Sequence, residues 1–171
     1  MNQLDIVKYF VEQTNCNLNL RYGDWTTLTW AVDCGNLSIL EYLVKTGKFD
    51  VNEKEEYGDN VAQYAIRSVE WNSLEYLLDG IPELKGVLNL LARNDEGKDA
   101  LDMCIDFKRK GRGYYGDPLT DDEKPKLDKC ILILKKARVD WFVTFACCLG
   151  GEFPEIPLRL VYEFCDVVPR D

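Results

Sequence analysis

The sequence predicts an all-α protein in which helical hairpins stack on one another as a solenoid. Three features support this prediction: amphipathic segments that recur, a period near 33 residues, and a glycine-containing turn at the start of each period. The recurring segments are NQLDIVKYFVEQ (2–13), NLSILEYLVKTG (36–47) and WNSLEYLLDG (71–80). A period of this length is typical of stacked repeats, in which each hairpin covers the apolar side of its neighbour.

The first segment, residues 2–20, has the pattern of half a repeat. Its helix at 2–13 has apolar residues at helical spacing, but no first helix precedes it. A helix without its hairpin partner leaves apolar surface exposed. We expect either that this half-repeat is an N-terminal cap or that upstream sequence completes it.

Three repeats follow, at about 21–54, 55–93 and 94–138. Their opening turns are RYGDW, EYGDN and NDEGKD, and their predicted first helices are TLTWAVDCG, VAQYAIRSV and ALDMCIDFK. Between turn and helix stand Thr26, Asn60 and Asp99. Each of these side chains has an oxygen that can cap the helix by accepting from its free N–H groups.

The second helix of each repeat carries the apolar stripe that packs on the next hairpin. In the repeat at 21–54, this stripe includes Leu37, Leu40 and Val44, together with the adjacent Ile39 and Leu43. Gly47 and Gly80 follow two of these helices at the C′ position, where glycine commonly ends a helix.

The last repeat is interrupted between its two helices. The first is predicted to end near Lys108, and the second spans 126–137 with an apolar face of Leu127, Cys130, Ile131 and Leu134. The insertion at 109–125 holds three glycines and two prolines, which disfavour regular structure. Two interpretations are open: a tolerated insertion, or a binding loop with Tyr114 and Tyr115 as its contacts.

Residues 139–171 depart from the repeat pattern. Asp140 is predicted to cap a helix at 141–149, which is apolar on every side and should be buried. Gly150 and Gly151 end this helix. We expect the region to form a helical cap that closes the last repeat, as solenoids require for solubility.

The period, turn and cap together resemble the ankyrin repeat over roughly residues 2–138. The family signature T-P-L-H-x-A appears as TTLTWA (26–31), NVAQYA (60–65) and DALDMC (99–104). The proline is absent from all three, and Thr29, Gln63 and Asp102 replace the histidine. In the family this histidine helps to hydrogen-bond neighbouring turns, so these bonds must be made by other groups here or are weaker.

The resemblance implies a non-enzymatic module that binds a partner protein on a concave strip of finger turns and first helices. The implied contacts are Tyr22, Asp24, Trp25, Asp33, Tyr57, Asp59, Arg67, Glu96 and Lys98. Trp25 is the expected hot spot, because large aromatic residues dominate interface energetics. The alternative is that Trp25 packs against the neighbouring repeat. Trp30, Trp71 and Trp141 are predicted to lie in the core.

A second hypothesis concerns FPEIPLRLVYEFC (153–165), which is similar to the start of an F-box although most of an F-box is missing. Ankyrin proteins of large DNA viruses often end in a related tail that recruits a ubiquitin ligase. The resemblance would make residues 153–168 a ligase adaptor and the repeats a substrate receptor. A short, degenerate array also suits a viral or parasite protein, which would act in the host cytoplasm.

Composition excludes several classes of function. The 171 residues carry a formal net charge of −9, which disfavours nucleic-acid binding because phosphate contacts need a basic face. Histidine is absent, which excludes Ser-His and Cys-His catalysis and histidine-bound metal. Seven scattered cysteines without a C-x-x-C pair indicate a reduced, intracellular protein. With no recognisable signal peptide or membrane span, we expect a monomeric cytoplasmic or nuclear protein without metal or cofactor.

Overall fold

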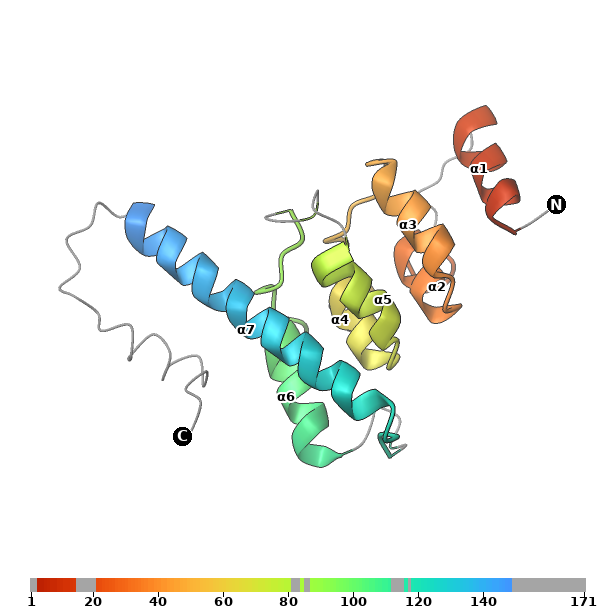
Figure 1. Cartoon of the computed structure of the whole chain (residues 1–171). Helices are drawn as coiled ribbons and strands as arrows, with labels where there is room; N and C mark the ends of the chain where they lie inside the picture. Colours follow the sequence, from red (N-terminus) through yellow and green to blue (C-terminus); the bar gives the residue numbers. More distant parts are fainter. Residues whose placement is uncertain are drawn as a thin grey trace.

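The computed structural model describes residues 3–14, 21–80, 84, 87–111, 116 and 118–148, with side chains of the last stretch described as far as Asp140. Within these residues the protein is helical and contains no strand. The helices are α1 (Gln3–Gln13), α2 (Thr27–Asp33), α3 (Leu37–Lys45), α4 (Val61–Arg67), α5 (Trp71–Glu75), α6 (Ala100–Lys110) and α7 (Glu123–Cys148), with a π-helical turn η1 (Tyr76–Gly80) after α5 (Figure 1). The predicted all-α solenoid is confirmed.

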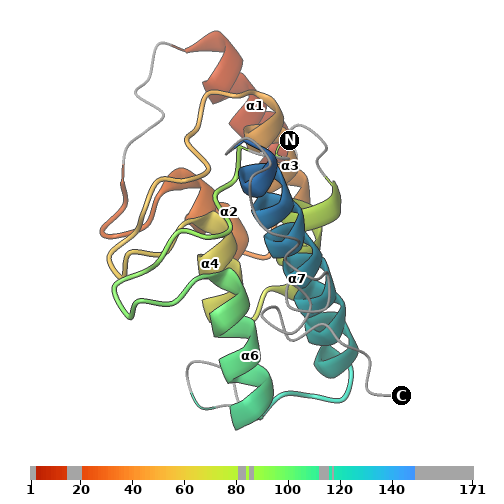
Figure 2. The same ribbon diagram turned by 90° about the vertical axis from the view of Figure 1, so that its left-hand side faces the viewer.

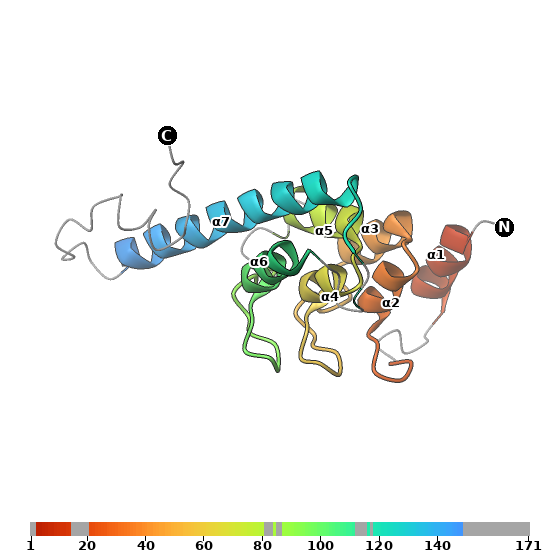
Figure 3. The same cartoon turned by 90° about the horizontal axis from the view of Figure 1, so that it is seen from below.

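The helices form two layers. Figure 3 shows α2, α4 and α6 in one row and α1, α3, α5 and α7 in the other, with loops that extend from the first row. Each hairpin packs internally, as α2 does on α3, and each row packs along its length, as α2 does on α4 and α4 on α6. The apolar faces are therefore covered by the preceding and following hairpins, as expected for a solenoid.

The three predicted N-caps are confirmed. The side chains of Thr26, Asn60 and Asp99 each accept a hydrogen bond of 2.9 to 3.2 Å from the backbone N–H three residues further on. In all three cases the side chain of that later residue accepts from the N–H of the capping residue, which completes a capping box. The repeated sequence pattern thus begins each first helix in the same way.

Two of the tryptophans predicted for the core have described side chains. Trp71 is buried, as expected, whereas Trp30 is 43% exposed and its predicted core position is wrong. The buried face of α2 is made by Leu28, Ala31 and Val32, and helical geometry places residue 30 on the opposite side. The side chain of Trp141 lies outside the described residues.

The two predicted stop glycines behave differently. Gly47 follows α3 with a φ of +63°, which confirms its C′ role. Gly80 is instead the last residue of η1 and does not adopt a positive φ. A Cβ at Gly80 would lie 2.5 Å from a ring carbon of Tyr76, so glycine at this position allows the ring of Tyr76 to pack against the backbone.

The last hairpin contains longer helices than predicted. Helix α6 runs to Lys110 and ends at Gly111, whose φ is +63°, and the predicted apolar face of α7 is buried. Helix α7 then continues through Asp140 to Cys148, so the predicted cap at Asp140 and the separate helix after it are wrong. No glycine or proline lies between Pro125 and Gly150 to stop the helix. The expected boundary at residue 138 therefore falls inside α7.

The N-terminal half-repeat forms the predicted helix α1, which packs on α3. Val11 is buried, but Ile6, Tyr9 and Phe10 are exposed on its outer side. The expectation that this unpaired helix exposes apolar surface is confirmed.

Candidate functional site

Three loops precede the first helices, and we name them finger 1 (21–26), finger 2 (55–60) and finger 3 (94–99). Figure 2 and Figure 3 show them side by side along one edge of the solenoid. Each finger turns at a glycine with a φ between +60° and +73°, a conformation that favours glycine. A backbone hydrogen bond of 3.0 to 3.2 Å joins the two arms of each finger.

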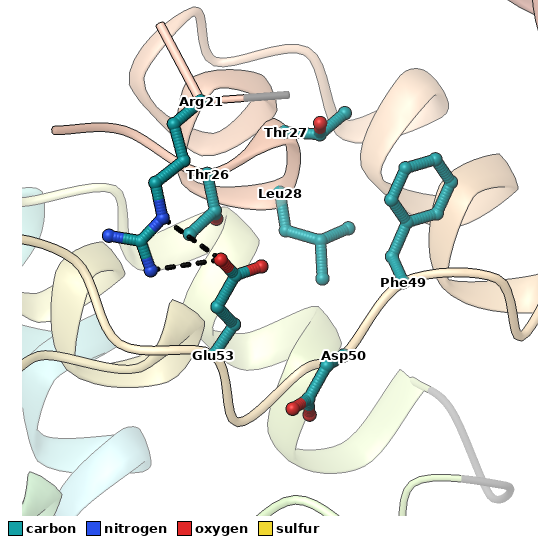
Figure 4. A pocket seen from close by; sticks show the side chains of 7 residues that line it. All are labelled: Arg21, Thr26, Thr27, Leu28, Phe49, Asp50 and Glu53. Atoms are coloured by element: carbon teal, nitrogen blue, oxygen red, sulfur yellow. Dashed lines mark hydrogen bonds and ion pairs between the residues drawn. The ribbon is translucent and has the colours of Figure 1, made fainter. Parts of the chain in front are cut away.

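Arg21 joins finger 1 to the segment just before finger 2. Its guanidinium donates to the Glu53 carboxylate at 2.9 and 3.0 Å (Figure 4). It also donates to the Lys54 carbonyl at 2.7 Å. The hollow beside this pair has a volume of only about 10 Å³, which is room for one water molecule at most. The hollow is too small for a ligand, and the pair of Arg21 and Glu53 is a structural contact between repeats.

Gln63 joins finger 2 to finger 3 at the position where the ankyrin signature has histidine. Its side-chain amide donates to the carbonyls of Ala92 (2.9 Å) and Lys98 (3.0 Å). Within the described residues, the side chain of Thr29, at the equivalent place one repeat earlier, hydrogen-bonds only Thr26. The glutamine therefore supplies the bonds to the next finger that the missing histidine would make.

An aromatic patch formed by Tyr22, Trp25 and Trp30 covers finger 1 and the adjoining side of α2. The ring centroids of Tyr22 and Trp30 lie 5.5 Å apart, and those of Trp25 and Trp30 lie 5.2 Å apart, both edge to face. Tyr22 is 73% exposed. Trp30 is a surface residue that was not predicted as one, although the spacing of the apolar residues of α2 indicates this position.

Trp25 is half-buried and connects finger 1 to the next repeat. Its indole N–H donates to the hydroxyl of Tyr64 at 2.7 Å, and that hydroxyl donates to Asp33 at 2.8 Å. The interpretation that Trp25 packs against the neighbouring repeat is confirmed. Its role as a hot spot stays a prediction, as does that of the exposed Asp33.

Asp59 and Arg67 are buried, with exposed fractions of 0% and 1%. Their predicted position on the binding strip is therefore wrong. The two side chains form an ion pair with each other, and Asp59 also accepts from the amide of Asn94 at 2.8 Å. Tyr57 is 47% exposed and lies over the guanidinium of Arg67, with 4.8 Å between Cζ and the ring centroid.

On finger 3, the charges of Glu96 and Lys98 are paired. The ammonium of Lys98 lies 2.9 Å from Glu96 and 2.8 Å from Asp106. Hydrogen bonds to Asp106 and Glu96 raise the pKa of Lys98, and the hydrogen bond from Lys98 lowers the pKa of Glu96. The charges of Glu96 and Lys98 therefore largely neutralise each other, whereas the exposed Asp95 on the same finger forms no ion pair within the described part of the chain.

Asp24 and Glu56 lie close to each other on fingers 1 and 2. The charge of Asp24 and a hydrogen bond to it raise the pKa of Glu56. Both residues are exposed. Among the described residues, no lysine or arginine forms an ion pair with either carboxylate, so the tips of these two fingers are acidic.

The described residues offer little for catalysis or metal binding. They hold no group of three or more cysteine, aspartate or glutamate side chains suited to a metal ion. Burial raises the pKa of Cys104 and, to about 11, that of Cys130, which makes both thiols unreactive. A hollow of about 830 Å³ beside α7 is lined mainly by leucines. No helix in the described part is long and apolar enough to cross a membrane.

The predicted contacts Tyr114 and Tyr115 lie outside the described residues, and so does the adaptor segment 153–168. These expectations therefore stay predictions. The same holds for the C-terminal cap beyond residue 148.

The family model for ankyrin repeats matches residues 1–85 in three copies. This part of the chain is an ankyrin-repeat array. Ankyrin repeats are generally protein–protein interaction modules and are typically non-enzymatic. No curated protein sequence matches the chain significantly. The ankyrin match ends before finger 3, although finger 3 and α6 have the same glycine turn and capping box as the matched repeats.

Proposed function

We propose that this chain is a non-enzymatic module that binds a partner protein along the fingers and first helices. The proposal extends the ankyrin-like array to about residue 138, because finger 3, α6 and α7 continue both layers and the contacts between neighbouring fingers. A backbone bond of 3.1 Å from Asp95 to Tyr57 is one of these contacts. The fingers therefore form one continuous surface that a partner can span.

The observation that carries the proposal is the aromatic patch. Tyr22 and Trp30 keep large parts of their rings exposed. The ring of Trp30 packs on Trp25, and the ring of Tyr22 packs on Trp30, so both rings are held in place before a partner binds. Rigid aromatic side chains lose little conformational entropy on binding and are enriched among hot spots. We assign the central contacts to Tyr22 and Trp30, with Asp24, Asp33, Tyr57, Glu96 and Lys98 around them and Trp25 as their support.

Quantitative affinity capture with mass spectrometry tests this assignment. We would compare the wild type with Tyr22→Ala/Trp30→Ala and with a matched control, Tyr9→Ala/Phe10→Ala, which removes two exposed aromatic rings from α1. Circular dichroism and urea unfolding would show whether each variant keeps its fold. We expect captured partners to fall about tenfold for the finger variant, a loss of ~1.4 kcal/mol, and to be retained by the control.

The opposite pattern contradicts the proposal. If a folded Tyr22→Ala/Trp30→Ala variant retains its partners while the α1 control loses them, the binding surface lies on the other layer.

A further inference from the structure

We propose that the partner segment that docks on the aromatic patch is basic: an extended stretch of protein that carries arginine or lysine side chains. This inference rests on the proposed function and names the chemistry of the partner. It follows from the charges that surround the patch and from the geometry of its rings.

Three carboxylates lie beside the patch. Asp24 lies within finger 1, Glu56 lies on the neighbouring finger, and Asp33 ends α2. In the described part of the chain, none of the three forms an ion pair with lysine or arginine. By contrast, Glu53 is paired with Arg21, and Glu96 is paired with Lys98. Unpaired negative charge therefore lies next to the exposed rings.

Asp24 and Glu56 also repel each other across the gap between fingers 1 and 2. This repulsion is what raises the pKa of Glu56. A cation placed between two carboxylates removes the repulsion and gains two favourable interactions. An arginine or lysine from a partner would supply that cation, and the formal net charge of −9 would attract it over longer distances.

The rings of the patch suit the same partner. A guanidinium or ammonium group binds favourably over the face of tryptophan or tyrosine within about 6 Å of the ring centroid. The described residues already include two such contacts, between Arg67 and Tyr57 at 4.8 Å and between Lys8 and Tyr42 at 5.7 Å. Exposed ring surface on Tyr22 and Trp30, next to unpaired carboxylates, offers a basic side chain both types of contact together.

Fluorescence anisotropy with labelled peptides tests the inference directly. The probes are three peptides of equal length, in which serine and glycine alternate with arginine, with glutamate or with glutamine. We expect the arginine peptide to bind, and its affinity to fall as salt is raised, because salt screens exposed charges. The glutamate and glutamine peptides should not bind.

Charge-matched variants locate the binding site. Asp24→Asn/Glu56→Gln removes two charges from the finger tips, and Asp121→Asn/Asp122→Asn removes two exposed charges from the loop before α7. We expect the first pair to weaken binding of the arginine peptide about tenfold and the second to change it less than about twofold. Trp30→Ala should also weaken binding, although it leaves the net charge unchanged.

Two results would overturn the inference: no binding of the arginine peptide, or equal weakening by both charge variants, which would mean that the peptide responds only to net charge. Affinity capture with the same variants distinguishes failure of this inference from failure of the proposed function. If their binding depends on Tyr22 and Trp30 but not on Asp24 and Glu56, the partner is not basic and the protein-binding function stands. If it depends on neither pair, both proposals fail.

Discussion

The indole N–H of Trp25 donates a 2.7 Å hydrogen bond to the hydroxyl of Tyr64, which lies 39 residues further along the chain. Tyr64 belongs to α4, and its hydroxyl donates in turn to Asp33 at the end of α2. Two repeats are thereby connected directly beneath the aromatic patch. Since Trp30 packs edge to face on Trp25, this connection also helps to orient the exposed ring of Trp30.

We expect Tyr64→Phe to lower the free energy of unfolding by about 1–2 kcal/mol, because the half-buried indole N–H of Trp25 loses its acceptor. Urea unfolding measures this loss. Tyr9→Phe is the matched control, since it removes a hydroxyl from an exposed ring on α1 and should change stability little. Equal effects of the two variants would show that the bond to Trp25 contributes nothing specific.

Gln63→Ala should loosen finger 3, because the carbonyls of Ala92 and Lys98 lose the amide that hydrogen-bonds them. We expect a loss of about 1–3 kcal/mol in stability and faster hydrogen exchange across residues 94–99. Thr29→Ala is the control at the equivalent place, where hydrogen bonds of the hydroxyl join it to Thr26 of its own turn. Thr29→Ala should speed hydrogen exchange only in finger 1 and α2. Faster exchange in finger 3 of this variant would contradict the explanation.

The glycines of fingers 2 and 3 should differ in their tolerance of alanine. Gly58 and Gly97 share a φ of +73°, so alanine at either position costs about 1–2 kcal/mol in backbone strain. A Cβ at Gly58 would also lie 2.9 Å from the backbone nitrogen of Asp95, whereas nothing lies within 4 Å at Gly97. We expect Gly58→Ala to lose about 1–3 kcal/mol more than Gly97→Ala in urea unfolding. Similar losses would mean that fingers 2 and 3 can move apart freely.

Removal of one partner of the buried ion pair should be more damaging than removal of both. Asp59→Ala leaves the guanidinium of Arg67 buried without this carboxylate, and we expect it to cost about 3–5 kcal/mol. The double variant Asp59→Leu/Arg67→Met should be clearly more stable than Asp59→Ala in thermal or urea unfolding. A double variant that is less stable than Asp59→Ala would contradict this explanation, because it would show that the unpaired guanidinium of Arg67 is not what destabilises the single variant.

The acidic finger tips predict a pH dependence. The pKa of Glu56 is above its ordinary value of 4.5 in the folded state because of Asp24, so the folded protein holds this proton more tightly than the unfolded chain does. The associated stability is complete below the unfolded pKa and is lost as pH rises through the folded pKa. Glu56→Gln should therefore be more stable than the wild type at about pH 7 and no more stable at about pH 3.5. Thermal unfolding at both pH values checks this difference, with Asp122→Asn as the control.

Some of the candidate site follows from the resemblance to ankyrin repeats. The resemblance implies that Tyr22, Asp24 and Tyr57 lie on the accessible strip beside turn glycines, and all three are exposed. It implies the same position for Asp59, but Asn94 of the next finger and Arg67 of α4 cover this residue. Polar residues beside a turn are usually solvated. Contacts with the neighbouring repeat determine which of them are buried.

The sequence by itself determined the repeat period, the three capping boxes and the α-helical hairpins, because each depends on residues within about one helical turn or on a spacing that recurs along the chain. Tertiary structure decided which charged side chains remain accessible and which of them meet: it buried the pair of Asp59 and Arg67, and it brought Asp24 close to Glu56. These outcomes depend on contacts between residues about 30 to 40 positions apart, and such contacts exist only once neighbouring repeats have stacked.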